Sequence, residues 1–246
     1  MPVLFLLMVT SLCAQLIQSQ LPAVSWASDP AFVSVQPSSS AADLKMEPSS
    51  LMDCAALCST KTWCSSFFYN RLQNRCLVFK GVYFDKRGLP STAGAEYYLI
   101  ASDRCPCQDG FYLGRPDNLC FFYLRENKTY NGSKELCQAN RGRLAILDTL
   151  SKNELVVLNM QLNNADVGAI VFLGARRHGE DFKWDNDNMV AAHNGSIQSF
   201  WAGNEPNTES CLVLKYSTQN LRINWHDIGC GRQGSGVLCE YQHATN

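Results

Sequence analysis

The chain has 246 residues, which leaves room for a targeting segment and one or two domains that each bury their own core. Charged residues make up 17% of the sequence, and the formal net charge is -1. Because there is no basic field to hold a nucleic-acid backbone by counterion release, the chain is not expected to bind DNA or RNA.

Residues 1–19 are predicted to be a secretory signal peptide. They begin with the apolar run MPVLFLLMVTSLCAQLI, which is too short for a comfortable membrane span, and the polar QSQ follows it. Cleavage is expected after Ser19, and Cys13 or Ala14 could also precede the cut. No later stretch is apolar for long enough to cross a bilayer, so the mature protein is expected to be secreted and extracellular, without a membrane span.

The cysteine content agrees with export, because oxidising compartments keep disulfides and the cytosol reduces them. Of the 12 cysteines, Cys13 would leave with the signal, so an odd number remains and one thiol must lack an internal partner. Three Asn-x-Ser/Thr acceptors are candidate N-glycosylation sites in the secretory pathway. They are Asn127, Asn131 and Asn194.

Residues 20–50 contain the Ser-rich and Pro-containing stretches QPSSS and EPSS and show no sustained apolar period, which indicates a disordered leader. The character of the chain changes at LMDCAALC, where Cys54 and Cys58 lie on one face of a predicted short helix. Two aromatic, β-rich runs follow, WCSSFFYN and RCLVF, with the turn-like NRLQN between them. We therefore expect a helix attached by disulfides to a hairpin.

This cysteine pattern resembles a reduced PAN/apple domain over residues 51–103. The spacing is Cys54-x3-Cys58-x5-Cys64-x11-Cys76, with Phe67 and Tyr69 after the third cysteine. The resemblance implies the disulfides Cys54–Cys76 and Cys58–Cys64, and a module that binds proteins or carbohydrates and has no catalytic residues. A generic disulfide-stapled mini-domain is the alternative interpretation.

From Cys105 onward the pattern predicts an α+β domain. The segment CQDGFYLGRPDNLCFFY is typical of a hairpin with Cys107 and Cys120 at its ends. Its turn residues are Gly114, Pro116, Asp117 and Asn118.

Two helices are predicted after this hairpin. The first bears Cys137 and ends near residues 140–142, before the strand RLAIL. The second runs through SKNELVVLNMQL and is expected to open with a capping box formed by Ser151 and Glu154. Its apolar residues at helical spacing are Leu155, Leu158 and Leu162.

Ordered motifs over residues 105–243 resemble a C-type lectin domain. FLGA at 172–175 stands where that family has its WIGL core strand, and FKWDND is similar to the run that follows it. Phe200, Trp201 and Gly203 then lead into the triplet Glu205-Pro206-Asn207, and Cys211, WHDIGC and VLCEY complete the frame. The resemblance implies a C-type lectin fold, with two helices and small antiparallel sheets joined by long loops. It also implies the disulfides Cys137–Cys239, Cys211–Cys230 and Cys107–Cys120.

These pairings leave Cys105 as the odd thiol, which predicts an intermolecular bridge and a covalent dimer. The choice between Cys105 and Cys107 stays open, since either could close the hairpin to Cys120.

A calcium site is predicted around the Glu-Pro-Asn triplet. Calcium takes six to eight oxygen ligands, and Glu205, Asn207 and Glu209 alternate within a short segment while Asp227 arrives from the next strand. If the bond before Pro206 is cis, as it is in the family, a tight turn aims the Glu205 and Asn207 side chains at one point. The resemblance implies recognition of mannose-type sugars by their equatorial 3- and 4-hydroxyls, whereas the galactose version reads Gln-Pro-Asp.

The sequence departs from the family at His226, where the usual Trp-Asn-Asp becomes Trp225-His226-Asp227. An imidazole replaces an amide oxygen, and nitrogen suits transition metals better than calcium. Three outcomes are open: a weaker calcium site, a changed sugar contact made by His226, or a site no longer used. The predicted carbohydrate-binding residues are Glu205, Asn207, Glu209, His226 and Asp227, and the predicted metal ligands are the same set without His226.

Other polar and aromatic residues have simpler interpretations. Four large aromatics, Phe172, Trp184, Trp201 and Trp225, are expected in the core. The run from Asp185 to Asn188 is expected to be a solvated turn, with a second calcium loop as the alternative. The histidines without metal-ligand spacing, His178, His193 and His243, are expected at the surface.

Together these features predict a secreted, calcium-dependent lectin for mannose-type glycans on microbial or self glycoproteins, in innate immune or cell-surface recognition. The alternative is a C-type-lectin-like module that binds protein without sugar, and the PAN/apple-like domain could add a protein partner. A zinc hydrolase using His226, Glu205 and Glu209 is a third hypothesis. Because no His-Glu-x-x-His, nucleophile elbow or phosphate loop occurs, the chain is not expected to be an enzyme.

Overall fold

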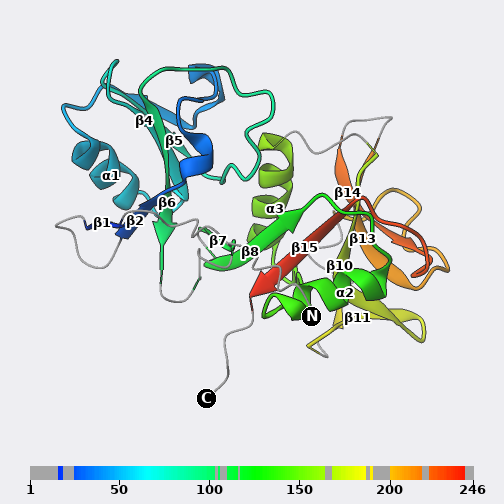
Figure 1. Cartoon of the computed structure of the whole chain (residues 1–246). Helices are drawn as coiled ribbons and strands as arrows, with labels where there is room; N and C mark the ends of the chain where they lie inside the picture. Colours follow the sequence, from blue (N-terminus) through cyan, green and yellow to red (C-terminus); the bar gives the residue numbers. More distant parts are fainter. Residues whose placement is uncertain are drawn as a thin grey trace, which may run out of the picture.

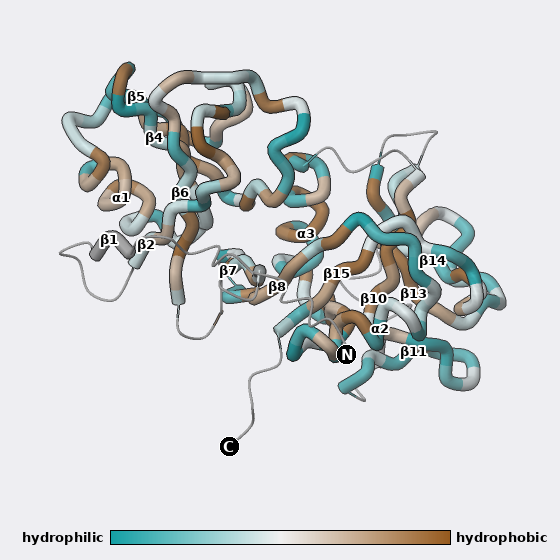
Figure 2. Tube along the Cα trace, in the orientation of Figure 1, coloured by the Kyte–Doolittle hydropathy of each residue, from teal (hydrophilic) through white to brown (hydrophobic). Residues whose placement is uncertain are grey.

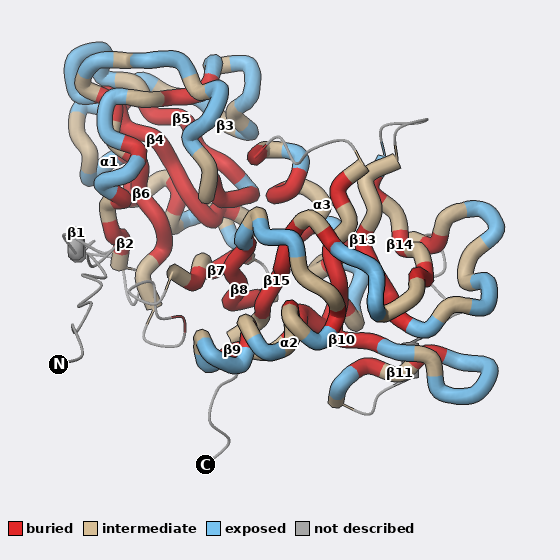
Figure 3. Tube along the Cα trace, turned by 45° about the vertical axis from the view of Figure 1, so that its right-hand side comes forward, coloured by how far each residue is buried: buried red, intermediate tan, exposed pale blue. Residues whose placement is uncertain are grey.

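A computed structural model describes residues 16–18, 25–102, 105, 110–115, 117–163, 168–186, 189–190, 200–217 and 222–241. Over these residues the chain forms a six-stranded sheet in its N-terminal half and a nine-stranded sheet in its C-terminal half (Figure 1). Strands supply most of the buried residues, whereas loops carry most of the exposed ones (Figure 3). None of the helices in the described ranges has the length and apolar character that a bilayer span requires.

The N-terminal sheet is antiparallel throughout, with strand order β1-β2-β6-β4-β5-β3. Its strands are β1 (Leu16–Gln18), β2 (Ser25–Ser28), β3 (Leu44–Met46), β4 (Ser66–Asn70), β5 (Arg75–Phe79) and β6 (Ala95–Ala101). Two short 3-10 turns, η1 (Pro30–Phe32) and η2 (Ser39–Ala41), precede helix α1 (Leu51–Ser59). The Ser50 side chain caps α1 by accepting a hydrogen bond from the Asp53 N–H. The predicted disulfides Cys54–Cys76 and Cys58–Cys64 are confirmed, and the first of them ties α1 to β5.

The prediction of a disordered leader over residues 20–50 is wrong for residues 25–50. Trp26 on β2 is fully buried, packs edge-on against Phe67 at 5.0 Å and donates to the Ser59 hydroxyl. The strands here are only three or four residues long, so their apolar residues are too few to produce a visible period in a Ser-rich sequence. Most of the predicted signal peptide lies outside the described residues, and its residues 16–18 form β1 on the edge of this sheet.

The C-terminal sheet follows the order β12-β11-β10-β15-β8-β7, while β13 pairs with β10 and β14, and β9 pairs with β15. The pairing of β10 with β15 is parallel and the other pairings are antiparallel. The strands are β7 (Tyr112–Gly114), β8 (Leu119–Leu124), β9 (Gly142–Leu144), β10 (Ile170–His178), β11 (Asp181–Trp184), β12 (Met189–Val190), β13 (Cys211–Tyr216), β14 (Ile223–Ile228) and β15 (Gly236–Tyr241). Apolar stretches run along β10, β15 and the neighbouring helix α3 (Figure 2).

Both predicted helices of this half are present, as α2 (Tyr130–Ala139) and α3 (Leu150–Leu162). The capping box at Ser151 and Glu154 is wrong, because α3 begins earlier and Thr149 is its N-cap. The Thr149 hydroxyl accepts a hydrogen bond from the Lys152 N–H at 3.2 Å. Ser151 therefore lies inside the first turn, where its hydroxyl is not needed as a cap.

The disulfides Cys137–Cys239 and Cys211–Cys230 are confirmed, but the predicted pair Cys107–Cys120 is wrong. Cys120 bonds to Cys105, whose backbone N–H donates to the Ser102 carbonyl at 2.9 Å. That hydrogen bond holds Cys105 beside the end of β6, with its Cα 5.4 Å from the Cα of Cys120. The predicted covalent dimer through Cys105 is wrong for the same reason, and Cys107 lies outside the described residues.

The two halves are joined by polar side chains of α3. The Asn159 side-chain oxygen accepts from the Val82 N–H at 2.6 Å, and that of Asn163 accepts from the N–H groups of Phe84 and Asp85 at 2.8 and 3.0 Å. The Asn163 amide also donates to the Val82 carbonyl at 2.9 Å. Both asparagines are almost fully buried, so they satisfy the backbone of the segment after β5 where water cannot.

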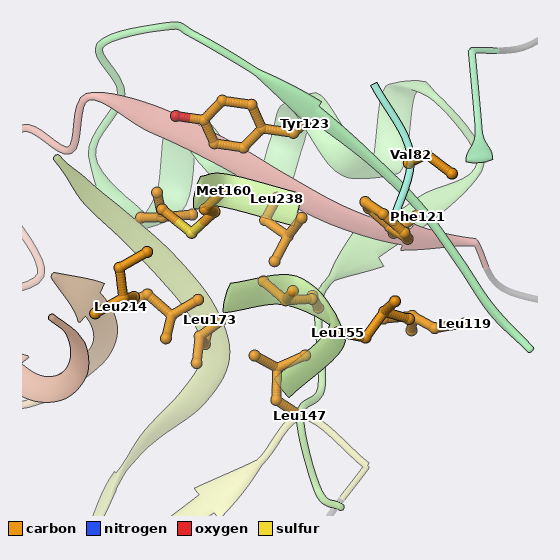
Figure 4. Close-up of a cluster of buried hydrophobic side chains, with 14 of the residues drawn as sticks. Val82, Leu119, Phe121, Tyr123, Leu147, Leu155, Met160, Leu173, Leu214 and Leu238 are labelled. Atoms are coloured by element: carbon orange, nitrogen blue, oxygen red, sulfur yellow. The ribbon is translucent and has the colours of Figure 1, made fainter. Parts of the chain in front are cut away.

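Apolar side chains continue this contact. Val82 from the N-terminal half lies next to Phe121 of the C-terminal half (Figure 4), and both belong to one buried cluster with Leu119 and Leu155. Phe84 adds a ring contact with Tyr123 at 5.2 Å between centroids. The two halves therefore share one hydrophobic core, and their relative position is set by packing as well as by hydrogen bonds.

Replacing Asn163→Ala is expected to lower the free energy of unfolding of the full chain by about 2 kcal/mol, because buried N–H and C=O groups lose their partner. Chemical denaturation followed by tryptophan fluorescence measures this change. Gln161→Ala, at an exposed position of the same helix, is the matched control and should change stability by less than about 0.5 kcal/mol. Equal effects of the two substitutions would contradict a structural role for the Asn163 contacts.

Candidate functional site

The candidate site lies where the loop before β13 meets the hairpin of β13 and β14, away from the N-terminal sheet (Figures 1 and 3). In this hairpin Leu212 is opposite Asp227 and Val213 is opposite His226. The Cys211–Cys230 disulfide closes the end of the hairpin from which the loop departs. The loop and the strand that carry the predicted ligands are therefore fixed to each other.

Trp225 anchors the loop from below. Its ring is fully buried, packs edge-on against Trp184 and Trp201 at 5.7 Å each, and donates through Nε1 to the Asn153 side-chain oxygen at 2.8 Å. The Trp225 carbonyl accepts from the Ala202 N–H at 3.0 Å. The core positions predicted for Phe172, Trp184, Trp201 and Trp225 are confirmed.

Four of the five predicted site residues come together above this anchor. The Glu205 carboxylate contacts His226 Nδ1 at 3.0 Å through one oxygen and accepts from the Asn207 side-chain amide at 3.1 Å through the other. Asp227 accepts from the Asn207 N–H at 3.0 Å and from the Glu209 N–H at 2.9 Å. The bond before Pro206 is cis, as expected.

Glu209 joins this cluster through its backbone only. Its carboxylate lies over Gly229, where an added Cβ would stand 3.2 Å from Oε2. In the described part of the chain no three His, Cys, Asp or Glu side chains converge as a metal cluster. The arrangement therefore does not support the zinc hydrolase hypothesis, which required the His226, Glu205 and Glu209 side chains to meet.

Arg177 at the end of β10 is a site residue that the sequence analysis missed. Its Nη2 donates to the Asp227 carboxylate at 2.9 Å and to the Asn207 carbonyl at 3.0 Å, and its Nε donates to the Glu209 carbonyl at 2.7 Å. The guanidinium also lies 4.7 Å from the centroid of the Phe182 ring. The paired arginines at the end of the core strand were the available signal, since one of them faces a loop rich in carboxylates.

The electrostatics of the cluster follow from burial and from the closeness of two carboxyl groups. Burial raises the pKa of Glu205 to about 7. The hydrogen bond to Asp227 and the negative charge of Asp227 contribute to this increase. Burial opposes ionisation of Asp227 too, but hydrogen bonds from Glu205, the Asn207 and Glu209 backbone and Arg177 bring its pKa below the ordinary value. Burial and the charge of Lys215 lower the pKa of His226.

The donor set fits calcium in kind. Two neighbouring carboxylates and an amide are the hard oxygen ligands that calcium takes, and a positive charge here would offset the burial and the nearby Asp227 carboxylate, which raise the pKa of Glu205. Arg177 already supplies such a charge to Asp227. The Asn207 amide oxygen accepts from the Glu209 N–H at 3.2 Å, so it would have to turn to reach an ion.

The remaining predicted positions lie away from this cluster or outside the described residues. Asp185 is in a turn, where it pairs with Lys134 at 3.2 Å and accepts from the Tyr130 hydroxyl. His178 is exposed, as are the candidate glycosylation sites Asn127 and Asn131. The residues not described are Asp187, Asn188, His193, Asn194 and His243.

Comparisons with known proteins identify both halves. A family model described as the Lectin C-type domain matches residues 126–241, and one described as the PAN domain matches residues 34–101. The human protein C-type lectin domain family 4 member D is 25% identical over 123 residues, which are 48% of this chain and 52% of that protein. The chain thus spans about half the length of the curated relative it matches.

Two solved structures have a similar C-terminal half. Human lithostathine has a TM-score of 0.46 and 18% identity, and the match covers 57% of this chain and 94% of that one. The C-type lectin domain of murine dendritic cell inhibitory receptor 2, in complex with N-glycan, has a TM-score of 0.41 and 21% identity over 51% of this chain and 91% of that one.

Replacing Asp227→Ala is expected to lower the free energy of unfolding by roughly 3 kcal/mol in the presence of EDTA, because Arg177 and two backbone N–H groups lose a buried acceptor. Asp181→Ala, at an exposed strand position, removes the same charge and is the control. Chemical denaturation of both variants measures the change in the free energy of unfolding. If the two substitutions cost the same, the Asp227 contacts do not hold the loop.

Proposed function

Because this chain joins a PAN domain to a C-type lectin domain, we propose that it is a carbohydrate-binding lectin that recognises mannose-type glycans with the help of calcium. The observation that carries this proposal is the pair formed by Glu205 and Asn207, which lie side by side with their side chains 3.1 Å apart. An ionised carboxylate only accepts hydrogen bonds, whereas an amide NH₂ donates them. Adjacent sugar hydroxyls would therefore meet one acceptor and one donor.

Calcium would be held by Glu205, Asn207 and Asp227, with Glu209 as the further predicted ligand. When bound, it would supply positive charge and open coordination positions for sugar hydroxyls. The chain's own residues select the ligand: Glu205 accepts from one hydroxyl and the Asn207 amide donates to the other. The order Glu-Pro-Asn is the one that resembles the mannose version of the family motif.

His226 takes part in this proposal as the residue that orients Glu205. Its Nδ1 lies 3.0 Å from Glu205 Oε1, on the side of the carboxylate opposite to Asn207. Of the outcomes predicted for this substitution, this contact favours a weakened calcium site over an unused one, since the imidazole holds a proposed ligand in place without replacing the lost amide oxygen.

We also propose that the protein is secreted and that its ligands are glycans on microbial or self glycoproteins, as in innate immune recognition. The disulfides and the two extracellular-type domains support this location. The PAN domain supports a possible protein partner. Protein binding through the lectin loops without sugar is the second candidate function, and it is favoured by Arg177, which already neutralises Asp227.

Wild-type protein is expected to be retained on mannan in calcium and released by EDTA. The double substitution Glu205→Gln with Asn207→Asp should weaken mannan binding by at least about tenfold and move the preference toward galactose, because the acceptor and the donor exchange positions. A glycan array measures both effects, and Glu135→Gln at an exposed position of α2 is the control. Undiminished mannan binding in EDTA would instead favour a calcium-independent mode, and no binding to any glycan would favour the protein-binding alternative.

Replacing His226→Asn is expected to tighten calcium binding several-fold, because an amide oxygen is a better calcium ligand than an imidazole nitrogen. Isothermal titration with calcium measures the dissociation constant directly. His178→Asn, at an exposed position at the end of β10, is the matched control. An unchanged dissociation constant in the His226 variant would exclude this position from the ion's surroundings.

A further inference from the structure

The Arg177 side chain on β10 binds both the Asp227 carboxylate and the backbone of residues 207–209. We propose that Arg177 stands in for part of the calcium charge at Asp227: it holds residues 207–209 in place when no ion is bound, and it competes with calcium for the Asp227 carboxylate. The second half of this inference rests on the proposed calcium site, whereas the first half does not.

The geometry of the guanidinium carries the first half. Arg177 reaches acceptors on two elements: the Asp227 carboxylate of β14 at 2.9 Å, and in the loop the Asn207 carbonyl at 3.0 Å and the Glu209 carbonyl at 2.7 Å. A planar guanidinium with five donors can bind several oxygens at once, which a side chain with one donor cannot do. The side chain is 19% exposed and the Asp227 side chain is fully buried, so this ion pair is shielded from water.

Both oxygens of the Asp227 carboxylate also accept hydrogen bonds from the loop backbone, Oδ1 from Asn207 and Oδ2, which Arg177 binds too, from Glu209. The N–H groups of Asn207 and Glu209 donate to this carboxylate at 3.0 and 2.9 Å, so the same two residues give their carbonyls to Arg177 and their N–H groups to Asp227. The Arg177–Asp227 pair therefore closes a ring of hydrogen bonds around residues 207–209. Loops that bind a cation obtain this closure from the ion, and here a side chain of the core strand β10 supplies it.

Arg177 is expected to compete with calcium because it carries a positive charge and already binds an oxygen of the Asp227 carboxylate. A fixed positive charge at hydrogen-bond distance from a carboxylate makes it a poorer ligand for a second cation, since like charges repel and the oxygen is already in use. Glu205 contacts the His226 imidazole and the Asn207 side-chain amide rather than Arg177, so its proposed ligand role does not depend on Arg177. Calcium would then bind weakly beside Glu205 unless Arg177 moves away from Asp227.

The test uses the full chain with Arg177→Gln, and Arg176→Gln is the matched control. Arg176 is the adjacent residue and carries the same charge, but it is exposed and lies over the Tyr130 ring at 5.6 Å. In EDTA, hydrogen exchange of the Asn207 and Glu209 amides should become about tenfold faster in the Arg177 variant and stay unchanged in the Arg176 variant. Added calcium should restore the protection.

Isothermal titration should then show calcium binding about tenfold tighter in Arg177→Gln than in Arg176→Gln, the order of change expected when one unit charge is removed beside the ion. Arg177→Lys separates charge from shape. It should keep the weak calcium binding of the wild type but exchange faster in EDTA, because an ammonium cannot span the three acceptors. This variant keeps the charge pair if the glutamine variant fails to fold.

The outcomes distinguish this inference from the proposed function. Tighter calcium binding in Arg177→Gln, in a protein whose wild type does not bind mannan, supports the inference and overturns the proposed lectin activity. Equal calcium dissociation constants in the Arg177 and Arg176 variants, or unchanged exchange in EDTA, overturn the inference while leaving mannan binding to be judged on its own. Absence of calcium binding in every variant overturns the competition with calcium and the proposed calcium-dependent function, while exchange in EDTA still decides whether Arg177 holds residues 207–209.

Discussion

The end of the lectin domain depends on one buried carboxylate. Asp227 is 3% exposed, and a buried charge is tolerated only where hydrogen bonds and opposite charge offset its lost hydration. The loop before β13 supplies two N–H groups, and β10 supplies Arg177. The requirement to satisfy this one group explains why residues 205–209 fold back onto the hairpin, and it places Glu205 and Asn207 where a ligand can reach them.

Helix α3 connects this site to the PAN domain. Near its start, Asn153 holds the Trp225 ring beneath the site, and near its end Asn159 and Asn163 hold the backbone at residues 82–85. All three asparagines are buried, so one helix places polar contacts at both ends of a shared core. The PAN surface is therefore fixed relative to the candidate site. Two ligands bound to the two domains would keep a constant separation, as they would not on a flexible linker.

Much of this arrangement could be predicted from the sequence, where local patterns carry the information. The two family resemblances implied four disulfides that the structure contains, and the ordered motifs around FLGA and Glu205-Pro206-Asn207 located the core strand and the candidate site. The failures were non-local. Strand β2 is ordered by pairing with β6, about seventy residues away, and Cys105 bonds to Cys120, which is 15 residues away. Neither contact produces a periodic pattern in the sequence of the residues that form it.

Arg177 was missed for a related reason, and it changes how the site should be understood. An arginine at the end of a strand is ordinarily a solvated side chain, and only the folded loop shows that it faces Asp227. The guanidinium of Arg177 pairs with the Asp227 carboxylate, so the protein itself meets part of the charge that a calcium ion would meet. A loop held in this way keeps its shape without an ion. In a loop held by an ion, the shape of the loop and its affinity for ligand both depend on that ion, whereas here the two are separate. Under the proposed function, calcium would govern affinity for sugar through Glu205 and Asn207, while Arg177 and Asp227 preserve the shape of the loop.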